Sequence, residues 1–402
     1  MDDKISVAEA LDRIDRHLLL SPPERLAVDA DAQGHILSAP VAAAADTPRF
    51  DCSAMDGFAI SSGATRDARA AAPAIFALAE DIPAAATARR LQPGSAAPIS
   101  TGAPIPADAD GVAAKERCLV IDGALHLSEP ITPWCNVRRR GEDAPAGKRV
   151  AEAGHVLSPE LIGALLGYGV THVEARRPAR IDVLATGSEL VSPADAVGSA
   201  RMDSNGPMIG AMCRSLGLEC RVSAPMPDDL TLLCRQIASR EEFPPADMLV
   251  STGGVSVGKH DLVREALDRI GARIIFHGIA MRPGKPILFA LLPDGRPFFG
   301  LPGNPVAALV GFRFFVLAAV RRMIGLPREE GCLIATPTAA RGGTTLFLRA
   351  RRGRTNRGSI KLLDDQRSHV MGSVVAADCW LRIDDTQNGP VAALFEQAPK
   401  LR

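Results

Sequence analysis

The chain has few aromatic residues, no excess of either charge sign and no paired cysteine motif. Phe, Trp and Tyr make up 4% of its 402 residues, which leaves few rings on which single-stranded bases could stack. Forty-six Lys and Arg residues balance 46 Asp and Glu residues, so no bulk field attracts nucleic acid or an anionic membrane. Composition therefore disfavours a nucleic-acid-binding protein, and a charged ligand must be held by a local cluster.

The eight cysteines are scattered along the chain and include no C-x-x-C pair, and the histidines form no H-E-x-x-H. This pattern argues against a disulfide framework and a thiolate zinc site. The first residues have no apolar core behind a basic start, so we expect no signal peptide. The most apolar run, 305–320, contains Arg313 and is short for a bilayer, so we expect a buried helix there. Together these features predict a cytoplasmic protein with reduced, mostly buried thiols and no membrane partner.

The length predicts roughly two to four domains. Residues 46–145 contain short apolar runs broken by Pro, Gly and Asp, which is typical of a small β-rich domain. From 180 to 326 strands alternate with helices, which favours a mostly parallel sheet covered on both faces. Short polar and apolar alternation follows over 327–402 and indicates a second β domain. The sequence thus predicts a multidomain α/β plus β protein whose N-terminal region, 1–179, carries the inserted β domain.

The strongest local signal is STGGVSVGKHD, residues 251–261. A buried strand leads into a glycine-rich turn and a helix start, so backbone N–H groups can approach an anion closely. His260 follows Gly258-Lys259, so the loop is not a Walker A motif; a tight connection without a ligand is the alternative. ATGSEL, residues 185–190, repeats the pattern. The predicted ligand-binding positions in these two loops are Thr186, Gly187, Ser251, Gly253, Gly254, Ser256 and Gly258.

Acidic residues stand at or near the ends of the predicted α/β elements. In an open parallel sheet, ligands bind beyond the carboxyl ends of the strands, and Mg²⁺ takes one or two protein carboxylates together with water and phosphate. We therefore predict Glu189 and Asp261 as magnesium ligands. Each acid could instead cap a helix, and we expect that role for Asp228 and Asp247. The helix that follows residues 228 and 229 is expected to be capped by Asp228 or Asp229.

Two further loops carry suitable groups. MRPGKPI places Arg282 and Lys285 around a Pro-Gly turn, and two fixed cations suit an oxyanion or a phosphate ester. GLPGNPVAA contains Pro302 and Asn304 before the long apolar helix; it is either a rigid wall of a site or a structural turn. The basic run 349–357 is more typical of a flexible hairpin.

Taken together and in this order, the loops resemble those of molybdopterin molybdenumtransferases, the MoeA/gephyrin family of molybdenum-cofactor enzymes. The matching stretches are SAMDGFA, STGAPIP, NVRRRGED, TGSEL, DSNG, STGGVSVGKHD, MRPGKP and GLPGNPVAA, between Ser53 and Ala308, with SHVMGSVVAADCW after them. The resemblance implies an α/β molybdopterin-binding domain, a C-terminal β-barrel-like domain and a homodimer whose site lies between subunits. It implies transfer of molybdate into adenylylated molybdopterin with release of AMP and with Mg²⁺ present. The molybdopterin adenylyltransferase and recipient molybdoenzymes are candidate partners.

The resemblance assigns further roles residue by residue. Those implied as catalytic are Asp56, Thr101, Asp143, Glu189, Asp229, Asp261 and Arg282. Those implied to bind the cofactor, besides the glycine loops, are Arg138, Lys285, Pro302, Asn304, Arg349 and Ser368.

This chain departs from the family pattern at three positions. Where it has Arg282 and Gly278, relatives often have Lys, and where it has Lys259, they often have an acidic residue. An oxyanion contact is therefore missing at Gly278 or supplied from elsewhere. Two other functions stay open: a molybdopterin adenylyltransferase, and a non-catalytic molybdopterin carrier or scaffold.

Overall fold

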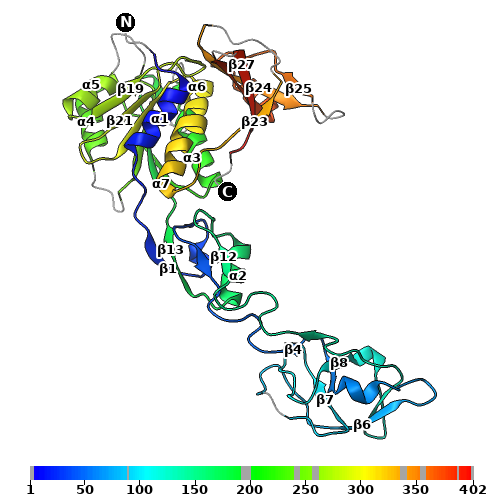
Figure 1. Ribbon diagram of the computed structural model, residues 1–402. Coiled ribbons are helices and arrows are strands. Elements are labelled where there is room, and N and C mark those ends of the chain that lie inside the picture. Colours follow the sequence, from blue (N-terminus) through cyan, green and yellow to red (C-terminus); the bar gives the residue numbers. More distant parts are fainter. Residues whose placement is uncertain are drawn as a thin grey trace. The chain divides into compact units, whose positions relative to one another are not determined.

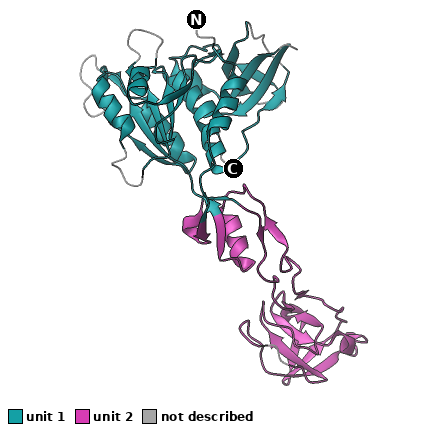
Figure 2. Ribbon diagram, turned by 60° about the vertical axis from the view of Figure 1, so that its left-hand side comes forward, with its two compact units in different colours: residues 1–24, 34–38, 175–402 teal, residues 25–33, 39–174 magenta. Residues whose placement is uncertain are grey.

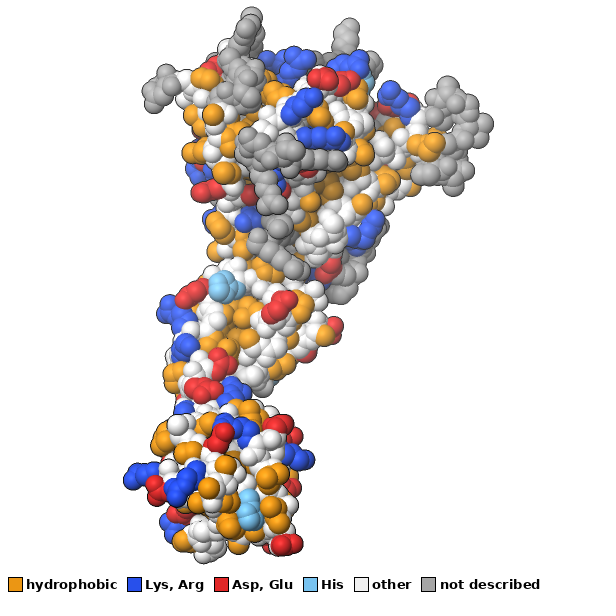
Figure 3. Space-filling model, turned by 90° about the vertical axis from the view of Figure 1, so that its right-hand side faces the viewer, with side chains coloured by type: hydrophobic (Ala, Val, Ile, Leu, Met, Phe, Trp, Pro, Cys, Tyr) orange, Lys and Arg blue, Asp and Glu red, His pale blue; other side chains and the backbone are white. Residues whose placement is uncertain are grey.

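The computed structural model describes residues 4–87, 90–191, 201–239, 245–255, 262–335, 342–353, 359–386 and 389–399. The chain forms two compact units (Figure 2). Unit 1 contains Met1–Glu24, Gly34–Ser38 and Ala175–Arg402, and unit 2 contains Arg25–Gln33 and Ala39–Glu174. Basic and acidic side chains lie interspersed on the viewed face of each unit (Figure 3), as the balanced composition predicts.

Unit 2 is built around a six-stranded sheet of order β8-β5-β7-β6-β10-β9. Its strands are β5 (Gly57–Ile60), β6 (Ala74–Leu78), β7 (Ser95–Ile99), β8 (Gly111–Ala114), β9 (Leu119–Ile121) and β10 (Ala124–Leu127). Alternate residues of β5 point to opposite faces, so Phe58 and Ile60 join one apolar cluster and Ala59 joins the other. Both faces of the sheet are therefore packed.

Smaller elements complete this part of the chain. Two-stranded pairs join β4 (Cys52–Ser53) to β11 (Val137–Arg138), and β3 (Val41–Ala42) to β12 (Arg149–Ala151). Helix α2 (Pro159–Gly167) begins after Ser158, whose hydroxyl accepts the Leu161 N–H, and Pro159 occupies its first position, where the fixed φ of proline suits a helix. A separate three-stranded sheet is formed by β1 (Glu24–Ala27), β2 (Ile36–Leu37) and β13 (His172–Arg176).

Gly57, in the SAMDGFA motif, is required by the spacing between β5 and β8. A Cβ at this position would overlap the carbonyl oxygen of Ala113. We expect Gly57→Ala to lower the free energy of unfolding of unit 2 by about 2 kcal/mol or more, because backbone cannot move aside as a flexible side chain can. Gly63→Ala, with nothing within 4 Å of its Cβ, is the matched control and should change stability by less than about 0.5 kcal/mol.

The two tryptophans allow the units to be followed separately in denaturant. Trp380 lies in unit 1 and Trp134 in unit 2, so in a Trp380→Phe background fluorescence reports on unit 2 alone. If the Gly57→Ala and Gly63→Ala variants had equal urea midpoints, the close approach of β5 and β8 would not require glycine at position 57.

Unit 1 contains the expected α/β sheet, in the order β17-β14-β18-β22-β21-β19. Its strands are β14 (Arg180–Ala185), β17 (Glu219–Val222), β18 (Met248–Thr252), β19 (Arg273–His277), β21 (Leu288–Leu291) and β22 (Pro297–Leu301). The first four strands in this order are parallel, but β21 and β19 are antiparallel to their neighbours. The connection 292–296 from β21 to β22 is too short for a parallel crossover, so the sheet is more mixed than the sequence predicts.

Helices cover both faces of this sheet (Figure 1). One face carries α4 (Leu230–Ala238) and α5 (Leu262–Arg269), and the other α1 (Val7–His17), α3 (Asn205–Ser215), α6 (Pro305–Gly311) and α7 (Leu317–Ile324). The apolar run predicted as a buried helix is α6, a π-helical turn (Phe312–Val316) and α7. Its Arg313 is buried, and its two terminal nitrogens donate to the Glu329 carboxylate at 2.5 and 2.7 Å. No helix among the described residues is long and apolar enough to cross a membrane.

The C-terminal part of unit 1 is a second sheet of order β20-β24-β26-β27-β23, with β25 beside β24. Its elements are β20 (Met281–Arg282), β23 (Cys332–Ile334), β24 (Thr345–Arg352), β25 (Ile360–Leu362), α8 (Met371–Ala376), β26 (Cys379–Thr386) and β27 (Gly389–Glu396). Short two-stranded contacts join β15 (Leu190–Val191) and β16 (Arg201–Met202). The described strands form an open path, so closure into a barrel stays a prediction.

The cysteines are less buried than expected. All eight are free thiols, but only Cys52, Cys213 and Cys379 are fully buried, and Cys332 is exposed. The other four are half-buried: Cys220 lies on the edge strand β17, Cys234 on helix α4, and Cys118 and Cys135 between elements.

Candidate functional site

Three of the predicted loops lie side by side at the carboxyl ends of β14, β18 and β22, which are neighbours in the sheet. The Thr186 N–H donates to the carbonyl of Thr252 at 3.0 Å, and the Gly253 N–H donates to that of Leu301 at 3.0 Å. Gly253 has a φ of 91°, and a Cβ there would overlap the carbonyl oxygen of Thr186. Only glycine allows the loops to approach this closely. The arrangement brings together the predicted residues Thr186, Gly187, Ser251, Gly253, Gly254, Pro302 and Asn304.

One member of this group, Ser251, is fully buried, so its side chain lies inside the protein and not at the surface of the loop. Its hydroxyl has no hydrogen-bond partner among the described residues. Ser256, Gly258 and Asp261 lie outside the part of the chain that the structure describes, so their predicted roles stay predictions.

Asn205 is a buried polar residue of this edge to which the sequence analysis assigned no role. Its Nδ2 donates to the carbonyl of Gly303 at 2.9 Å, which ties the start of α3 to the Pro302–Asn304 loop. Its Oδ1 is buried and without a partner in the described ranges. Asp203 holds the same turn by accepting the N–H groups of Asn205 and Gly206 at 3.0 and 3.1 Å. Asp203, Asn205 and Gly206 all belong to the DSNG motif, which could have indicated this turn from the sequence.

Glu189 is the exposed acid at this edge. Gly187, with a φ of 150°, precedes it, and a Cβ on Gly187 would lie 2.7 Å from Glu189 Oε2. The glycine therefore leaves room for the carboxylate to fold back over the turn. Among the described residues the Glu189 side chain makes no hydrogen bond or ion pair, so it is available to a ligand.

The neighbouring aspartates have structural partners that differ from those expected. Asp229, not Asp228, caps α4: its Oδ1 accepts the Leu232 N–H at 2.8 Å. Asp228 instead accepts the Ser188 N–H at 3.2 Å and so fixes the TGS turn. The helix-cap prediction was also wrong for Asp247, whose carboxylate pairs with Arg177 at 2.6 and 2.7 Å. These roles depend on which element begins next. Helix α4 begins at Leu230, so Asp229 is its cap residue, whereas Asp247 precedes the strand β18 and has no helix to cap.

A magnesium ion fits this donor set only in part. No group of three or more His, Cys, Asp or Glu residues in the described ranges could hold a metal. Mg²⁺ does not need such a group, since one or two carboxylates with water and a substrate phosphate suffice. Glu189 is the one carboxylate named above at the carboxyl edge that is not already used by the fold. It is compatible with this kind of site.

Arg282 lies on β20, which pairs with β24 of the C-terminal sheet. It lines an open pocket of about 630 Å³ with Pro283, residues 346–348 of β24 and the loop 364–367. Arg367 in this loop pairs with Asp365 at 2.6 Å, whereas Arg282 has no ion-pair partner in the part of the chain that is described. Arg282 is thus a cation without an ion-pair partner at the pocket wall, which Asp364 also lines.

The predicted residues Arg349 and Ser368 belong to the same neighbourhood. Arg349 is fully buried, and its Nη2 donates to the carbonyls of Asp365 and Arg367 at 3.0 and 3.3 Å. Burial lowers the pKa of this guanidinium, and its Nε and Nη1 have no partner among the described residues. Ser368 follows this loop, and its Oγ accepts the side-chain N–H of Asn304 at 3.2 Å. The segment that contains Ser368 is therefore tied to the GLPGNP loop by a side-chain hydrogen bond.

In unit 2 the three predicted loops also converge. Both the N–H and the hydroxyl of Thr101 donate to Asp56 Oδ1 at 2.8 Å, and the hydrogen bond from the Thr101 N–H is the main cause of a lowered pKa for Asp56. The Gly102 N–H donates to the carbonyl of Ser53 at 2.8 Å, and Ser53 pairs with Val137 across β4 and β11. Asp56, Thr101 and the NVRRRGED segment thus form one loop cluster.

The charged segment of this cluster is internally paired. Arg138 Nε donates to Glu142 at 3.0 Å, and hydrogen bonds from Arg139 and then Arg138 lower the pKa of Glu142. Asp143 is exposed, at 3.5 Å from the Tyr168 hydroxyl. Arg139 lies 3.6 Å above the ring of Trp134, an exposed aromatic residue that the sequence analysis did not single out.

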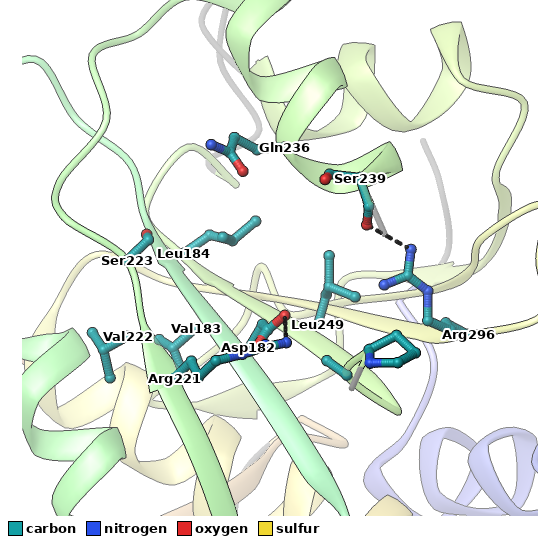
Figure 4. A pocket seen from close by; sticks show the side chains of 12 residues that line it. Asp182, Val183, Leu184, Arg221, Val222, Ser223, Gln236, Ser239, Leu249 and Arg296 are labelled. Carbon is teal, nitrogen blue, oxygen red and sulfur yellow. Dashed lines mark hydrogen bonds and ion pairs between the residues drawn. The ribbon is translucent and has the colours of Figure 1, made fainter. Parts of the chain in front are cut away.

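A different cavity in unit 1, of about 190 Å³, lies between β14, β17 and α4 (Figure 4). Its charged groups satisfy one another: Arg221 pairs with Asp182 at 2.7 Å, and Arg296 with Asp294 at 2.7 Å. Pro245, Ala246 and Arg296 precede β18 and β22, so the cavity is on the amino side of these strands. It presents no uncompensated cation for an oxyanion.

The fold and the loop arrangement define a multidomain α/β protein with an anion-binding edge on its sheet. Two family models match the chain: "MoeA N-terminal region (domain I and II)" over residues 5–169, and "Probable molybdopterin binding domain" over residues 182–322. The chain belongs to the MoeA family.

Named relatives extend over most of the chain. It is 31% identical to a molybdopterin molybdenumtransferase of Staphylococcus aureus over 392 residues, covering 96% of this chain and 93% of the relative. It is 34% identical to molybdopterin molybdenumtransferase 2 of Mycobacterium tuberculosis over 323 residues, covering 77% and 79%. The molybdopterin biosynthesis MoeA protein of Pyrococcus horikoshii OT3 has the same fold, with a TM-score of 0.75 at 22% identity, covering 98% of this chain and all of that one.

Proposed function

We propose that this protein is a molybdopterin molybdenumtransferase, which inserts molybdate into adenylylated molybdopterin and releases AMP to give molybdenum cofactor. The chain acts in molybdenum cofactor biosynthesis, since the relatives that cover 96% and 77% of it are named molybdopterin molybdenumtransferases. The observation that carries the proposal is the juxtaposition of the TGSEL, STGG and GLPGNP loops at one edge of the sheet. Matches over both the N-terminal region and the α/β domain favour this reaction over adenylylation alone.

The described residues suggest a division of roles. The backbone N–H of Gly254 would hold the substrate phosphate, since glycine lets the anion approach the backbone, while the Gly253 N–H is held by the carbonyl of Leu301. Asp56, fixed by Thr101, would orient the substrate from the inserted domain. Arg282 and Lys285 would bind oxyanions by charge. A magnesium ion held by Glu189 and Asp261 would supply Lewis-acid stabilisation of the charge that develops on the phosphoanhydride.

Assembly and partners are further parts of the proposal. We propose a homodimer in which the inserted domain of one subunit contributes to the site of the other. The reason for this proposal is that loops with predicted site residues occur in both units, and the loops of each unit contact one another within that unit. The molybdopterin adenylyltransferase as supplier and molybdoenzymes as recipients follow from the substrate and the product.

The test is AMP release from adenylylated molybdopterin in magnesium buffer, with and without micromolar molybdate. We expect molybdate-dependent release together with cofactor that reconstitutes an apo-molybdoenzyme, and chelation of the divalent ions should abolish both. Tight substrate binding without release would favour the carrier, and ATP consumption without any effect of molybdate would favour the adenylyltransferase.

A further inference from the structure

Trp134 is an exposed aromatic side chain in the loop cluster of unit 2. It is 44% exposed, and the guanidinium carbon of Arg139 lies 3.6 Å from the centroid of its ring, within the range of a cation–π interaction. Single exposed apolar side chains are common on protein surfaces, so exposure alone indicates nothing about function. The distinguishing feature of Trp134 is that both its backbone and its ring are held in place.

The backbone of Trp134 has a φ of 63°, in the left-handed region. A bulky side chain rarely adopts this conformation, which glycine adopts freely. Hydrogen bonds hold the residue there: its N–H donates to the carbonyl of Asp110, and its carbonyl accepts the Val137 N–H at 3.2 Å. Strained positions of this kind occur preferentially at functional sites. The strain is therefore a reason to ask what the tryptophan ring does.

The cation that covers the ring is fixed as well. Arg139 Nε donates to Asp51 Oδ1 at 3.3 Å, and the Arg139 N–H donates to Glu142 Oε2 at 2.8 Å. Because Arg139 occupies one face of the indole while 44% of the side chain is exposed, the opposite face and the ring edges are where a ligand can approach. A flat surface that is already held in place loses little conformational entropy when a ligand binds.

The chain places this ring at the start of a predicted site segment. Trp134 lies four residues before Arg138 in the stretch that leads into NVRRRGED. The Ala54 N–H donates to the carbonyl of Asn136 at 2.9 Å, which ties the stretch to the SAMDGFA loop with its Asp56. Trp134 thus belongs, within unit 2, to the same group of loops as the residues implied to contact the substrate.

We propose that Trp134 stacks against a planar heteroaromatic ring of the substrate, either the adenine or the pterin. The proposal rests on the proposed function for the identity of the ring. Stacking recognises the flat π face of a heterocycle, which the oxyanion-binding residues do not contact. Trp134 is accordingly a substrate-binding residue that favours ligands carrying such a ring.

The test uses full-length protein in the Trp380→Phe background, in which Trp134 is the only tryptophan. Its emission is followed while AMP is added and, separately, while ribose 5-phosphate, which lacks the base, is added. Titration calorimetry measures the affinities for AMP and for 6-hydroxymethylpterin. Circular dichroism in urea measures stability.

Three variants are compared in this background. Trp134→Gly removes the ring, and glycine adopts the positive φ without strain, whereas Trp134→Phe keeps an aromatic ring. The control is Ile75→Ala, which truncates an exposed apolar residue on β6 of the same unit.

For Trp134→Gly we expect the affinity for one of the two ring compounds to fall about tenfold, which corresponds to about 1.4 kcal/mol and matches the loss of a stacked base. Trp134→Phe should stay within about threefold, and Ile75→Ala should be unchanged. Loss of AMP affinity alone, with quenching by AMP but not by ribose 5-phosphate, assigns the ring to adenine. Loss of affinity for the pterin alone assigns it to the pterin.

Equal affinities of Trp134→Gly and the parent protein for both compounds would overturn the proposal, as would a parent protein that binds neither at millimolar concentration. A lower urea midpoint of Trp134→Gly with unchanged affinities would show that the ring only holds the loop. The proposed function can fail independently: a protein that binds AMP or the pterin through Trp134 but shows no molybdate-dependent AMP release is not a molybdenumtransferase, yet the stacking site stands. Conversely, normal molybdate-dependent turnover of Trp134→Gly at unchanged half-saturating substrate leaves the function intact and removes Trp134 from the site.

Discussion

Glu189→Gln is expected to reduce molybdate-dependent AMP release by roughly 100-fold while leaving the fold intact. The side chain is exposed and makes no hydrogen bond or ion pair with other described residues, so its loss should not change the unfolding temperature. The amide keeps the shape but removes the charge that would hold Mg²⁺, and metal stabilisation of a phosphoryl transition state is worth several kcal/mol. The measurement is kcat for AMP release at saturating molybdate over a range of magnesium concentrations.

The matched control is Glu219→Gln, an acid at the other end of the same sheet. Glu219 begins β17 and pairs with Arg180 at 2.6 Å, far along the strands from the glycine loops. We expect this variant to keep wild-type turnover and magnesium dependence. Full activity of Glu189→Gln at low magnesium would remove this residue from the metal site, whatever the role of Asp261.

Arg349→Met is expected to separate stability from activity. The buried guanidinium has two nitrogens without partners among the described residues and makes no ion pair with a carboxylate there. A buried charge without a paired carboxylate is costly to desolvate, and an apolar chain of similar volume removes that cost. We therefore expect the free energy of unfolding to change by less than about 1 kcal/mol, although two backbone carbonyls lose a donor.

Turnover of the same variant should nevertheless fall by about 100-fold. Arg349 holds the carbonyls of Asp365 and Arg367, and so the loop that lines the Arg282 pocket and leads to Ser368. Displacement of a substrate-positioning loop by about 1 Å can cost this much. The assay is AMP release, with Trp380 fluorescence as a check of the C-terminal sheet. A purely structural Arg349 would give the reverse: a marked loss of stability and near-normal kcat in the folded fraction.

Much of the site could be predicted from the sequence because its parts are local. A buried strand followed by Gly253-Gly254, or by Thr186-Gly187, encodes both the turn and its place at the carboxyl end of a strand. Ser6 and Ser158 mark helix starts through hydrogen bonds that span three residues. These features depend on neighbours in the chain, so they can be read without a fold. The motifs, in their order, were also sufficient to indicate the family.

The tertiary structure decided what depends on residues distant in sequence. Whether Asp228 or Asp229 caps α4 depends on where the helix begins and on Ser188, forty residues earlier. The antiparallel pairing of β19 and β21 depends on which strands become neighbours in the sheet, and the hydrophobic periodicity of a strand does not indicate its neighbour. The buried state of Arg349 arises because separate segments of the chain, including the loop 364–367, pack around it. Local patterns thus determined which loops carry the chemistry, whereas packing between segments determined which charges stand beside one another and which remain uncompensated.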